Sequence, residues 1–110
     1  MTTSVPPRIV PLTKLSEYLL NPEHRAGGPK SVFFRAFGFS GDRLDVMIAA
    51  LIAHPDLNPV EQVRTDQWGT RYVARCNVES PDGRNPCILT VWIVPPGQVD
   101  ATLVTAYPAD

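Results

Sequence analysis

The sequence predicts an α+β domain in which N-terminal helices pack on an antiparallel β-sheet of three to four strands. Three observations lead to this fold class. Apolar residues recur at helical spacing in the first half of the chain, β-branched and aromatic residues gather after Pro59, and Asp82–Gly83 marks a hairpin turn. With 110 residues, 44% of them hydrophobic, the chain is expected to form one domain over residues 11–110, preceded by a flexible arm over residues 1–10.

Three helices are expected before the strands. The first spans residues 12–20 and stops before Pro22, because the residue that precedes a proline disfavours helical backbone. The second spans residues 29–37. The third is the best defined, with Asp42 as a suitable N-cap and Pro55 as its end. Its apolar side chains form one stripe: Leu44, Met47, Ile48, Leu51 and Ile52.

Four strands are expected in the second half of the chain. Residues 72–79 alternate between two faces, and residues 87–94 are nearly all apolar, as in a central strand covered on both faces. The hairpin turn joins these two strands. Residues 60–64 form a weaker strand, and residues 103–107 form the last one, next to residues 87–94. Helices followed by an antiparallel meander predict that the helices cover one face of the sheet.

Composition limits the functions that the chain can have. A net charge of −1 gives no electrostatic reason for general nucleic-acid affinity, although it is compatible with a small local basic site. The sequence has no charged-then-apolar leader and no apolar run near the roughly 18 residues of a membrane span, so we expect a cytoplasmic protein. The two cysteines and two histidines are too far apart for a metal-ligand spacing, and neither a metal nor another cofactor is expected.

Five conspicuous side chains receive structural interpretations. Trp68 and Trp92 are better explained by core packing than by stacking on bases. His54 is interpreted as an ordinary helix C-terminal residue with little functional weight. Cys76 and Cys87 lie on the two arms of the hairpin, where a disulfide is possible. Without a secretory signal, two buried free thiols are expected.

The segment NPEHRAGGPK combines the residue types of an anion site. Gly27 and Gly28 leave backbone amides open to an anion, and Pro29 suits the first position of a helix. Lys30 falls on the same helical stripe as the phenylalanines that follow, which places its charge at a cleft or lets its stem cross the core while the ammonium reaches water. His24 can act as a general base or acid, or can cap the helix end.

The last strand supplies two hydroxyl groups. Strand alternation places Leu103, Thr105 and Tyr107 on one face, where the threonine and the tyrosine either bind a phosphate or simply pack as good β-formers. Arg71 stands at a strand start and can lean over a cleft. These residues are the remaining candidates for a polar site.

Four segments together carry a resemblance to a known family: YLLNPEH, GGPKSVFFRAFGF, TVWIV and LVTAYP. In this order they resemble a family of small bacterial domains of unknown function, found alone and at the C-terminal ends of polymorphic toxins. The resemblance covers residues 12–108. That family is associated with the superfamily of barnase, EndoU, colicin-D and RelE ribonucleases. Its fold, with N-terminal helices on an antiparallel sheet, agrees with the order of elements above.

The resemblance implies a metal-independent ribonuclease that forms a 2′,3′-cyclic phosphate. In this family-based assignment, His24 is the general base or acid, Lys30 neutralises the phosphate, and Thr105 and Tyr107 bind or polarise it. The substrate-binding residues are Gly27, Gly28, Ser31 and Arg71. The implied partners are an RNA substrate and a cognate antitoxin or immunity protein.

Two other interpretations stay open. The chain can be a non-catalytic interaction or accessory protein of the same fold, which predicts an exposed apolar patch around the loop Pro95–Pro96. It can also bind a phosphate-bearing ligand at the helix start Gly27–Gly28, without a role for Tyr107.

Overall fold

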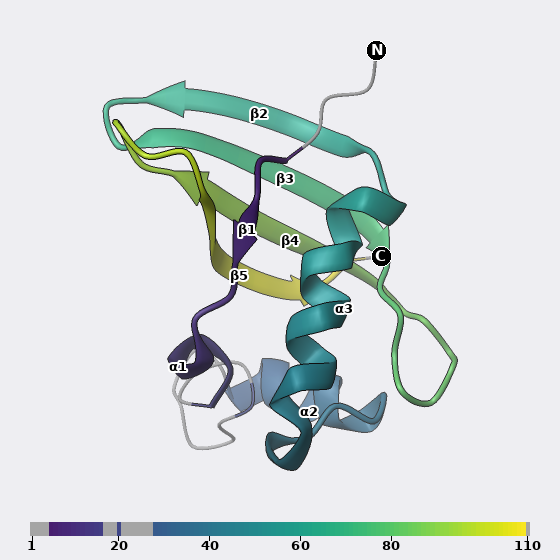
Figure 1. Cartoon of the computed structure of the whole chain (residues 1–110). Helices are drawn as coiled ribbons and strands as arrows, with labels where there is room; N and C mark the ends of the chain where they lie inside the picture. Colours follow the sequence, from purple (N-terminus) through teal and green to yellow (C-terminus); the bar gives the residue numbers. More distant parts are fainter. Residues whose placement is uncertain (1–4, 17–19, 21–27, 110) are drawn as a thin grey trace.

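The structure, a computed structural model, describes residues 5–16, residue 20 and residues 28–109 (Figure 1). It confirms the α+β class. The predicted helix over residues 12–20 lies partly outside the described residues, as do His24 and Gly27. In chain order the elements are β1 (Arg8–Ile9), α1 (Leu12–Lys14), α2 (Gly28–Ala36), a 3₁₀ turn (Gly41–Arg43), α3 (Leu44–Leu57), β2 (Val60–Asp66), β3 (Gly69–Asn77), β4 (Cys87–Val94) and β5 (Ala101–Pro108).

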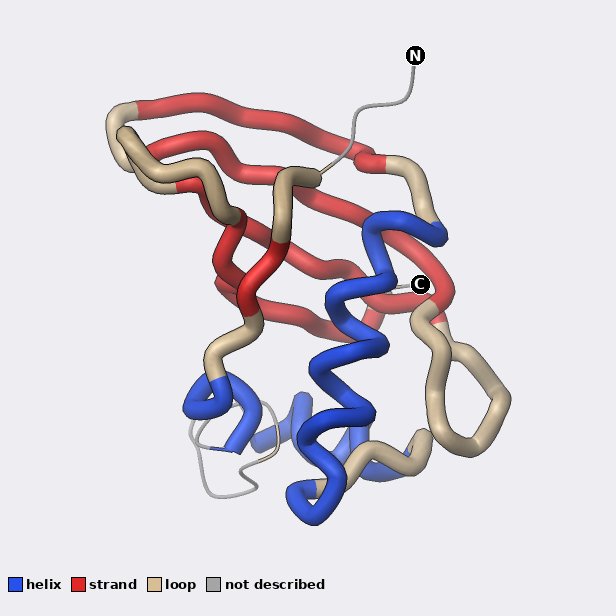
Figure 2. The backbone as a smooth tube through the Cα atoms, viewed as in Figure 1, coloured by secondary structure: helices blue, strands red, loops and turns tan. Residues whose placement is uncertain are grey.

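The sheet differs from the prediction in strand number and in type. It has five strands in the order β1-β5-β4-β3-β2, and it is mixed, because β1 runs parallel to β5 while the other neighbours are antiparallel. Figure 2 shows the strands in red and the helices in blue. Arg8 pairs with Ala101 and Ile9 with Thr102. A strand of two residues is too short to show alternation in the sequence. The pairing depends on β5, which lies more than 90 positions later in the chain.

The helix α3 covers one face of the sheet, as predicted (Figure 1). Its inward side chains meet the strands in a single core, to which α2 adds Phe34. The largest apolar side chains with less than 2% exposure are Trp92, Phe34, Leu15, Met47, Leu51 and Ile88. Removal of such side chains from water is the main favourable contribution to folding, at about 1.5–3 kcal/mol each.

Both predicted ends of α3 are wrong. Asp42 does not cap α3 but lies inside the 3₁₀ turn that precedes it. Pro55 lies inside the helix, which continues to Leu57. A proline this near the C-terminus removes only one helical hydrogen bond, and tertiary contacts hold the last turn. Asp56 accepts a hydrogen bond from Arg8 at 2.6 Å, and the Asn58 side chain donates to the His54 carbonyl at 3.0 Å.

A β-bulge corrects the predicted faces of β5. Leu103 pairs with Trp92 of β4, whereas Thr105 pairs with Val91, so Val104 is an extra residue in β5. Cross-strand partners share a face and adjacent residues alternate, and Leu103 and Thr105 therefore lie on opposite faces. Leu103 enters the core with 2% exposure. Thr105 and Tyr107 do share a face, and it is the one opposite α3.

Cys76 and Cys87 are free thiols, as expected, but neither is fully buried. Cys76 pairs with Ile88 and Cys87 with Asn77 across the hairpin, so the two cysteines are not direct cross-strand partners. No helix in the described part of the chain is long and apolar enough to cross a membrane.

Candidate functional site

Three of the four predicted catalytic side chains lie together at β5, in the part of this strand that extends past the two-residue β1 and forms the edge of the sheet. The Lys30 ammonium donates a hydrogen bond to Thr105 Oγ1 at 3.2 Å. The same Nζ lies 5.8 Å from the centroid of the Tyr107 ring, within the range of a cation–π contact. Lys30 and Thr105 are 75 positions apart in the sequence. The fold thus brings one cation and two hydroxyl-bearing side chains into a cluster that we call the Lys30 cluster. The fourth predicted residue, His24, is outside the described residues.

Packing of α2 explains the position of Lys30. Phe34, one turn after Lys30, is completely buried, and its ring meets Phe33 at 5.2 Å and Phe39 at 5.9 Å between centroids. These contacts fix the rotation of α2 and direct the lysine toward β5. The bulge at Val104 determines the position of the other two side chains, because it turns both Thr105 and Tyr107 to the face opposite α3.

The predicted substrate-binding residues do not all face the cluster. Ser31 has no exposed surface, and its hydroxyl accepts a hydrogen bond from Arg35 Nε at 3.0 Å. Gly28 begins α2, so the first-turn amides follow it, and Gly27 lies outside the described residues. Arg71 is on β3, where it pairs with Asp66 at 3.0 Å. It shares a face with Thr105 but lies two strands away, about 10 Å at the usual strand spacing.

Arg71 and the Lys30 cluster lie on the same face of the sheet, the one opposite α3, which we call the open face. Strand register orders its side chains in rows across the sheet. All of them except Leu89 keep solvent exposure in the described structure. The rows are Arg64, Arg71, Ile93 and Thr102; Gln62, Val73, Val91 and Thr105; and Arg75, Leu89 and Tyr107. The open face therefore has an apolar centre, arginines along β2 and β3, and the Lys30 cluster at its β5 edge.

The two tryptophans have opposite environments. Trp92 is completely buried, which confirms the core interpretation, whereas Trp68 is 64% exposed, so its core interpretation is wrong. Trp68 occupies the turn between β2 and β3, beyond the end of the sheet, where no core lies beneath it. Its backbone N–H donates to Asp66 Oδ1 at 2.8 Å, which holds the turn in place.

His54 has a buried polar environment that sequence reasoning missed. Its Nε2 donates to the Cys76 carbonyl at 2.8 Å, and its Nδ1 lies 2.9 Å from Thr90 Oγ1. Because a carbonyl only accepts, the proton is on Nε2, and in the neutral ring Nδ1 accepts from the Thr90 hydroxyl. That hydroxyl in turn accepts from Trp92 Nε1 at 3.0 Å. The chain of donors runs from Trp92 through Thr90 and His54 to the Cys76 carbonyl.

Burial sets the charge state of this histidine. Loss of water contact lowers the pKa of His54 below its ordinary 6.5, and hydrogen bonds with the backbone of Cys76 and Ile88 oppose this only in part. The ring is therefore neutral at neutral pH and joins α3 to β3 and β4. A lone histidine near a helix end gives no sequence signal for this role, because its partners come from two later strands.

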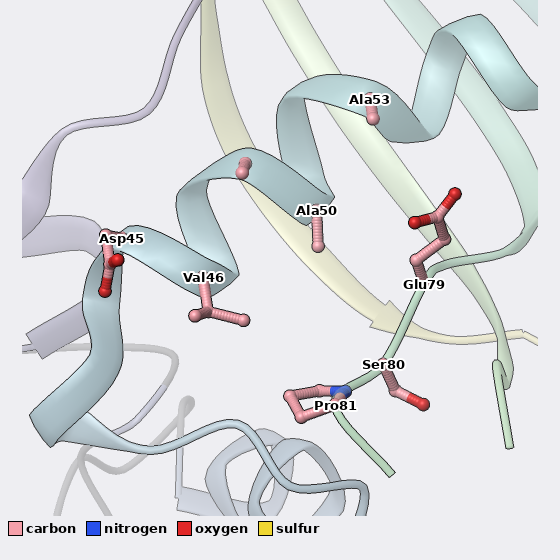
Figure 3. Close-up of a pocket in the computed structure, with 8 residues that line it drawn as sticks. Asp45, Val46, Ala50, Ala53, Glu79, Ser80 and Pro81 are labelled. Carbon is pink, nitrogen blue, oxygen red and sulfur yellow. The ribbon is translucent and has the colours of Figure 1, made fainter. Parts of the chain in front are cut away.

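A concave region lies between α3 and the segment after β3 (Figure 3). Its volume is about 570 Å³. In Figure 3, Val46 and Ala50 point toward the segment that carries Ser80 and Pro81. Small apolar side chains and two carboxylates line it: Asp45, Val46, Ala49, Ala50, Ala53, Glu79, Ser80 and Pro81. None of the predicted site residues that the structure describes is among them, so this groove, the α3 groove, is separate from the Lys30 cluster.

Among the described residues, no group of three or more His, Cys, Asp or Glu side chains is arranged to hold a metal ion. The polar chemistry of the Lys30 cluster is that of a cation and hydroxyl donors, which suits an anionic ligand such as a phosphate.

Comparison with known proteins found a similar fold and a matching sequence family. The structure is similar to a chain of the contact-dependent growth inhibition toxin–immunity protein complex from Klebsiella pneumoniae 342. The TM-score is 0.74 at 14% sequence identity, with 93% of each chain covered, so the likeness concerns the fold. No curated protein matches the sequence significantly. Residues 4–110 match one family model, and the chain belongs to that family, the Domain of unknown function (DUF6883).

Proposed function

We propose that this chain is a toxin-type, metal-independent ribonuclease that cleaves RNA through a 2′,3′-cyclic phosphate. The observation that supports the proposal is the Lys30 cluster, in which Lys30, Thr105 and Tyr107 come together from the two ends of the chain. The resemblance of the sequence to toxin-associated domains led to the same residues. The proposal requires one phosphate to bind at this edge of the sheet.

The chemistry follows from the kinds of group present. The ribose 2′-oxygen attacks the adjacent phosphorus and the bond from phosphorus to the 5′-oxygen breaks, while a base removes the 2′-proton and an acid protonates the leaving oxygen. Negative charge grows on the phosphoryl oxygens. The Lys30 ammonium and the Thr105 hydroxyl are placed to stabilise that charge, and one such donor commonly contributes about 10²–10³ in rate. Tyr107, 37% exposed, offers a further hydroxyl, and His24 is proposed as the base or acid.

The proposed partner is a cognate immunity or antitoxin protein. Support comes from the Klebsiella pneumoniae 342 neighbour, which belongs to a toxin–immunity protein complex and has the same fold. An RNA-cleaving toxin needs such a partner in the cell that produces it. The exposed side chains of the open face are where an inhibitor would block the Lys30 cluster directly.

Induced expression with RNA analysis tests the proposal. Wild-type protein, Lys30→Met and His24→Ala are induced in cells, and total RNA is examined for fragments that end in a cyclic phosphate. Lys14→Met is the matched control, because Lys14 and Lys30 are the two lysines of the chain. Growth arrest and cleavage that are lost in Lys30→Met and His24→Ala, but kept in Lys14→Met, are expected. Intact RNA and normal growth with folded wild-type protein would refute the proposal.

The second candidate function is that of an interaction protein without catalysis. It is favoured by exposed apolar side chains at one end of the sheet, Trp68 at 64% and Val99 at 75% exposure, and by the α3 groove. The turn after β2 and the loop after β4 lie side by side there, since Gly69 packs against Val94 and Pro95. In this case, expression has no effect on RNA, and Lys30→Met behaves as wild type.

The third candidate, binding of a phosphate-bearing ligand at the start of α2, needs no contribution from Tyr107.

A further inference from the structure

The turn between β2 and β3 carries an exposed tryptophan, Trp68, and the strands on either side of this turn carry the paired arginines Arg64 and Arg71. We propose that Trp68, Arg64 and Arg71 form a subsite for single-stranded RNA, in which a base stacks on Trp68 and the arginines bind the flanking phosphates. This inference rests on the proposed function and extends it. It defines where an RNA strand that is bound at the Lys30 cluster would leave the protein.

The position of Trp68 is fixed although its ring is exposed. The backbone N–H of Trp68 is bonded to Asp66 Oδ1 at 2.8 Å. The next residue, Gly69, has φ of +127°, and a Cβ there would overlap the Val94 carbonyl oxygen. The backbone before the ring is therefore held by the side chain of Asp66, and the backbone after it is packed against the end of β4. A large aromatic surface, 64% exposed on a rigid turn, loses little conformational freedom when a base stacks on it.

The two arginines are a pair of like charges that does not stabilise the fold. Arg64 and Arg71 are direct cross-strand partners on the open face, and like charges in that arrangement destabilise a sheet. Asp66 pairs with Arg71 at 3.0 Å, which offsets one of the two charges. Arg64 forms none of the ion pairs found among the described residues. One carboxylate, paired with one of the two arginines, leaves this corner of the sheet with a net positive charge, which is complementary to a phosphate.

The open face provides a path between this corner and the Lys30 cluster. Thr105 and Val73 stand in one row, and Arg71 is two residues along β3 from Val73. Two strand spacings across and two residues along amount to about 12 Å, the span of a few nucleotides. The side chains between the two ends are Val73, Val91 and Ile93, which are short and apolar. A single RNA strand with its bases splayed apart can cross these side chains. In an RNA duplex the bases stay stacked on each other and are unavailable to Trp68.

Binding of an uncleavable strand tests the subsite. The probe is a short 2′-O-methyl oligoribonucleotide, which lacks the nucleophilic hydroxyl, used single-stranded and annealed to its complement. The chain has two tryptophans, and Trp92 is completely buried, so quenching of intrinsic fluorescence reports on Trp68. Because Trp68→Leu lacks the reporting ring, the affinities of the variants and of the wild type are compared by the anisotropy of the same oligonucleotide carrying a fluorescent label. Trp68→Leu should bind about 5- to 150-fold more weakly, the range that base stacking on an aromatic residue supports. Arg64→Gln should reduce the slope of log affinity against log salt by about 0.7.

Val99→Ala is the matched control, because Val99 is an exposed apolar side chain in the neighbouring loop region and lies outside the proposed subsite. Quenching by the single strand, weaker binding in Trp68→Leu and unchanged binding in Val99→Ala would support the subsite. Equal binding by wild type and Trp68→Leu would overturn it and leave the ribonuclease proposal intact. If the wild type binds no strand and leaves cellular RNA intact, both proposals fail. If Trp68→Leu loses a purified immunity partner but binds RNA normally, the ring is a protein anchor and the RNA subsite is wrong.

Discussion

Acidification should weaken the fold through His54. The ring has no exposed surface and is neutral in the folded state, with Nδ1 accepting from Thr90 and Nε2 donating to the Cys76 carbonyl. A second proton would have to enter Nδ1, where it would meet the Thr90 hydroxyl and displace the proton that this hydroxyl now donates. The charge would also be buried, away from water, and this burial is the main reason why the pKa of His54 is lowered.

The direction of the pH effect follows from the lowered pKa. Unfolded His54 titrates near 6.5, and folded His54 titrates below that value. The unfolded state therefore binds more protons as the pH falls through 6.5, and the free energy of unfolding decreases. The contribution of His54 is fully present above pH 6.5 and is lost as the pH approaches the pKa of the folded state. One proton sets the largest slope, about 1.4 kcal/mol per pH unit.

Urea unfolding at a series of pH values between about 8 and 5 measures this effect. His54→Gln is the informative variant, because an amide can accept from Thr90 and donate to Cys76 but does not titrate. We expect the free energy of unfolding of this variant to depend less on pH in this range than that of the wild type. His54→Ala should cost about 3 kcal/mol at neutral pH, since it leaves a buried hydroxyl and carbonyl without their partner and creates a cavity. Parallel pH profiles for wild type and His54→Gln would refute the reasoning.

Three further substitutions test other parts of the structure. Thr105→Val keeps the shape of the side chain and removes the Lys30 partner, so RNA cleavage should fall about 10²-fold while urea unfolding changes by less than about 1 kcal/mol. Tyr107→Phe should lower the cleavage rate without loss of strand binding, and equal rates would exclude its hydroxyl from the reaction. Gly69→Ala should destabilise the fold by more than about 2 kcal/mol, because it combines a positive φ with overlap at β4. Gly41→Ala, at an open position without positive φ, is its control in the same unfolding assay and should be nearly neutral.

The sequence was sufficient wherever a local pattern decides the structure. The apolar stripe of α3 and the apolar run of β4 each cover several turns or residues, and both elements occur where they were predicted. The bulge at Val104 has no such signature, because it depends on how β5 aligns with β4. The same holds for the two-residue β1, whose partner is distant in sequence. Alternation alone therefore placed Leu103 and Thr105 on one face, where the structure separates them.

The candidate side chains chosen from the sequence differ in how far local chemistry predicted their surroundings. Lys30 and Thr105 were chosen from local chemistry and from family resemblance, and the fold places them 3.2 Å apart. For Trp68 and His54, local chemistry predicted the wrong environment. A tryptophan is usually buried and a histidine at a helix end usually exposed, but here the first lies in a turn beyond the sheet and the second beneath β3 and β4. Both environments are set by residues that lie elsewhere in the sequence.

The distribution of charge makes a net charge of −1 compatible with the proposed RNA substrate. Arg64, Arg71 and Arg75 lie on the open face, whereas Asp45 and Glu79 border the α3 groove on the other side of the sheet. Each side of the sheet thus has its own local charge, although the total is close to zero. Because Asp66 and Glu61 pair with two of the arginines, few phosphates can be neutralised at once. RNA binding by such a face should therefore have a shallow salt dependence and be confined to short single strands, unlike that of a protein with a large excess of positive charge.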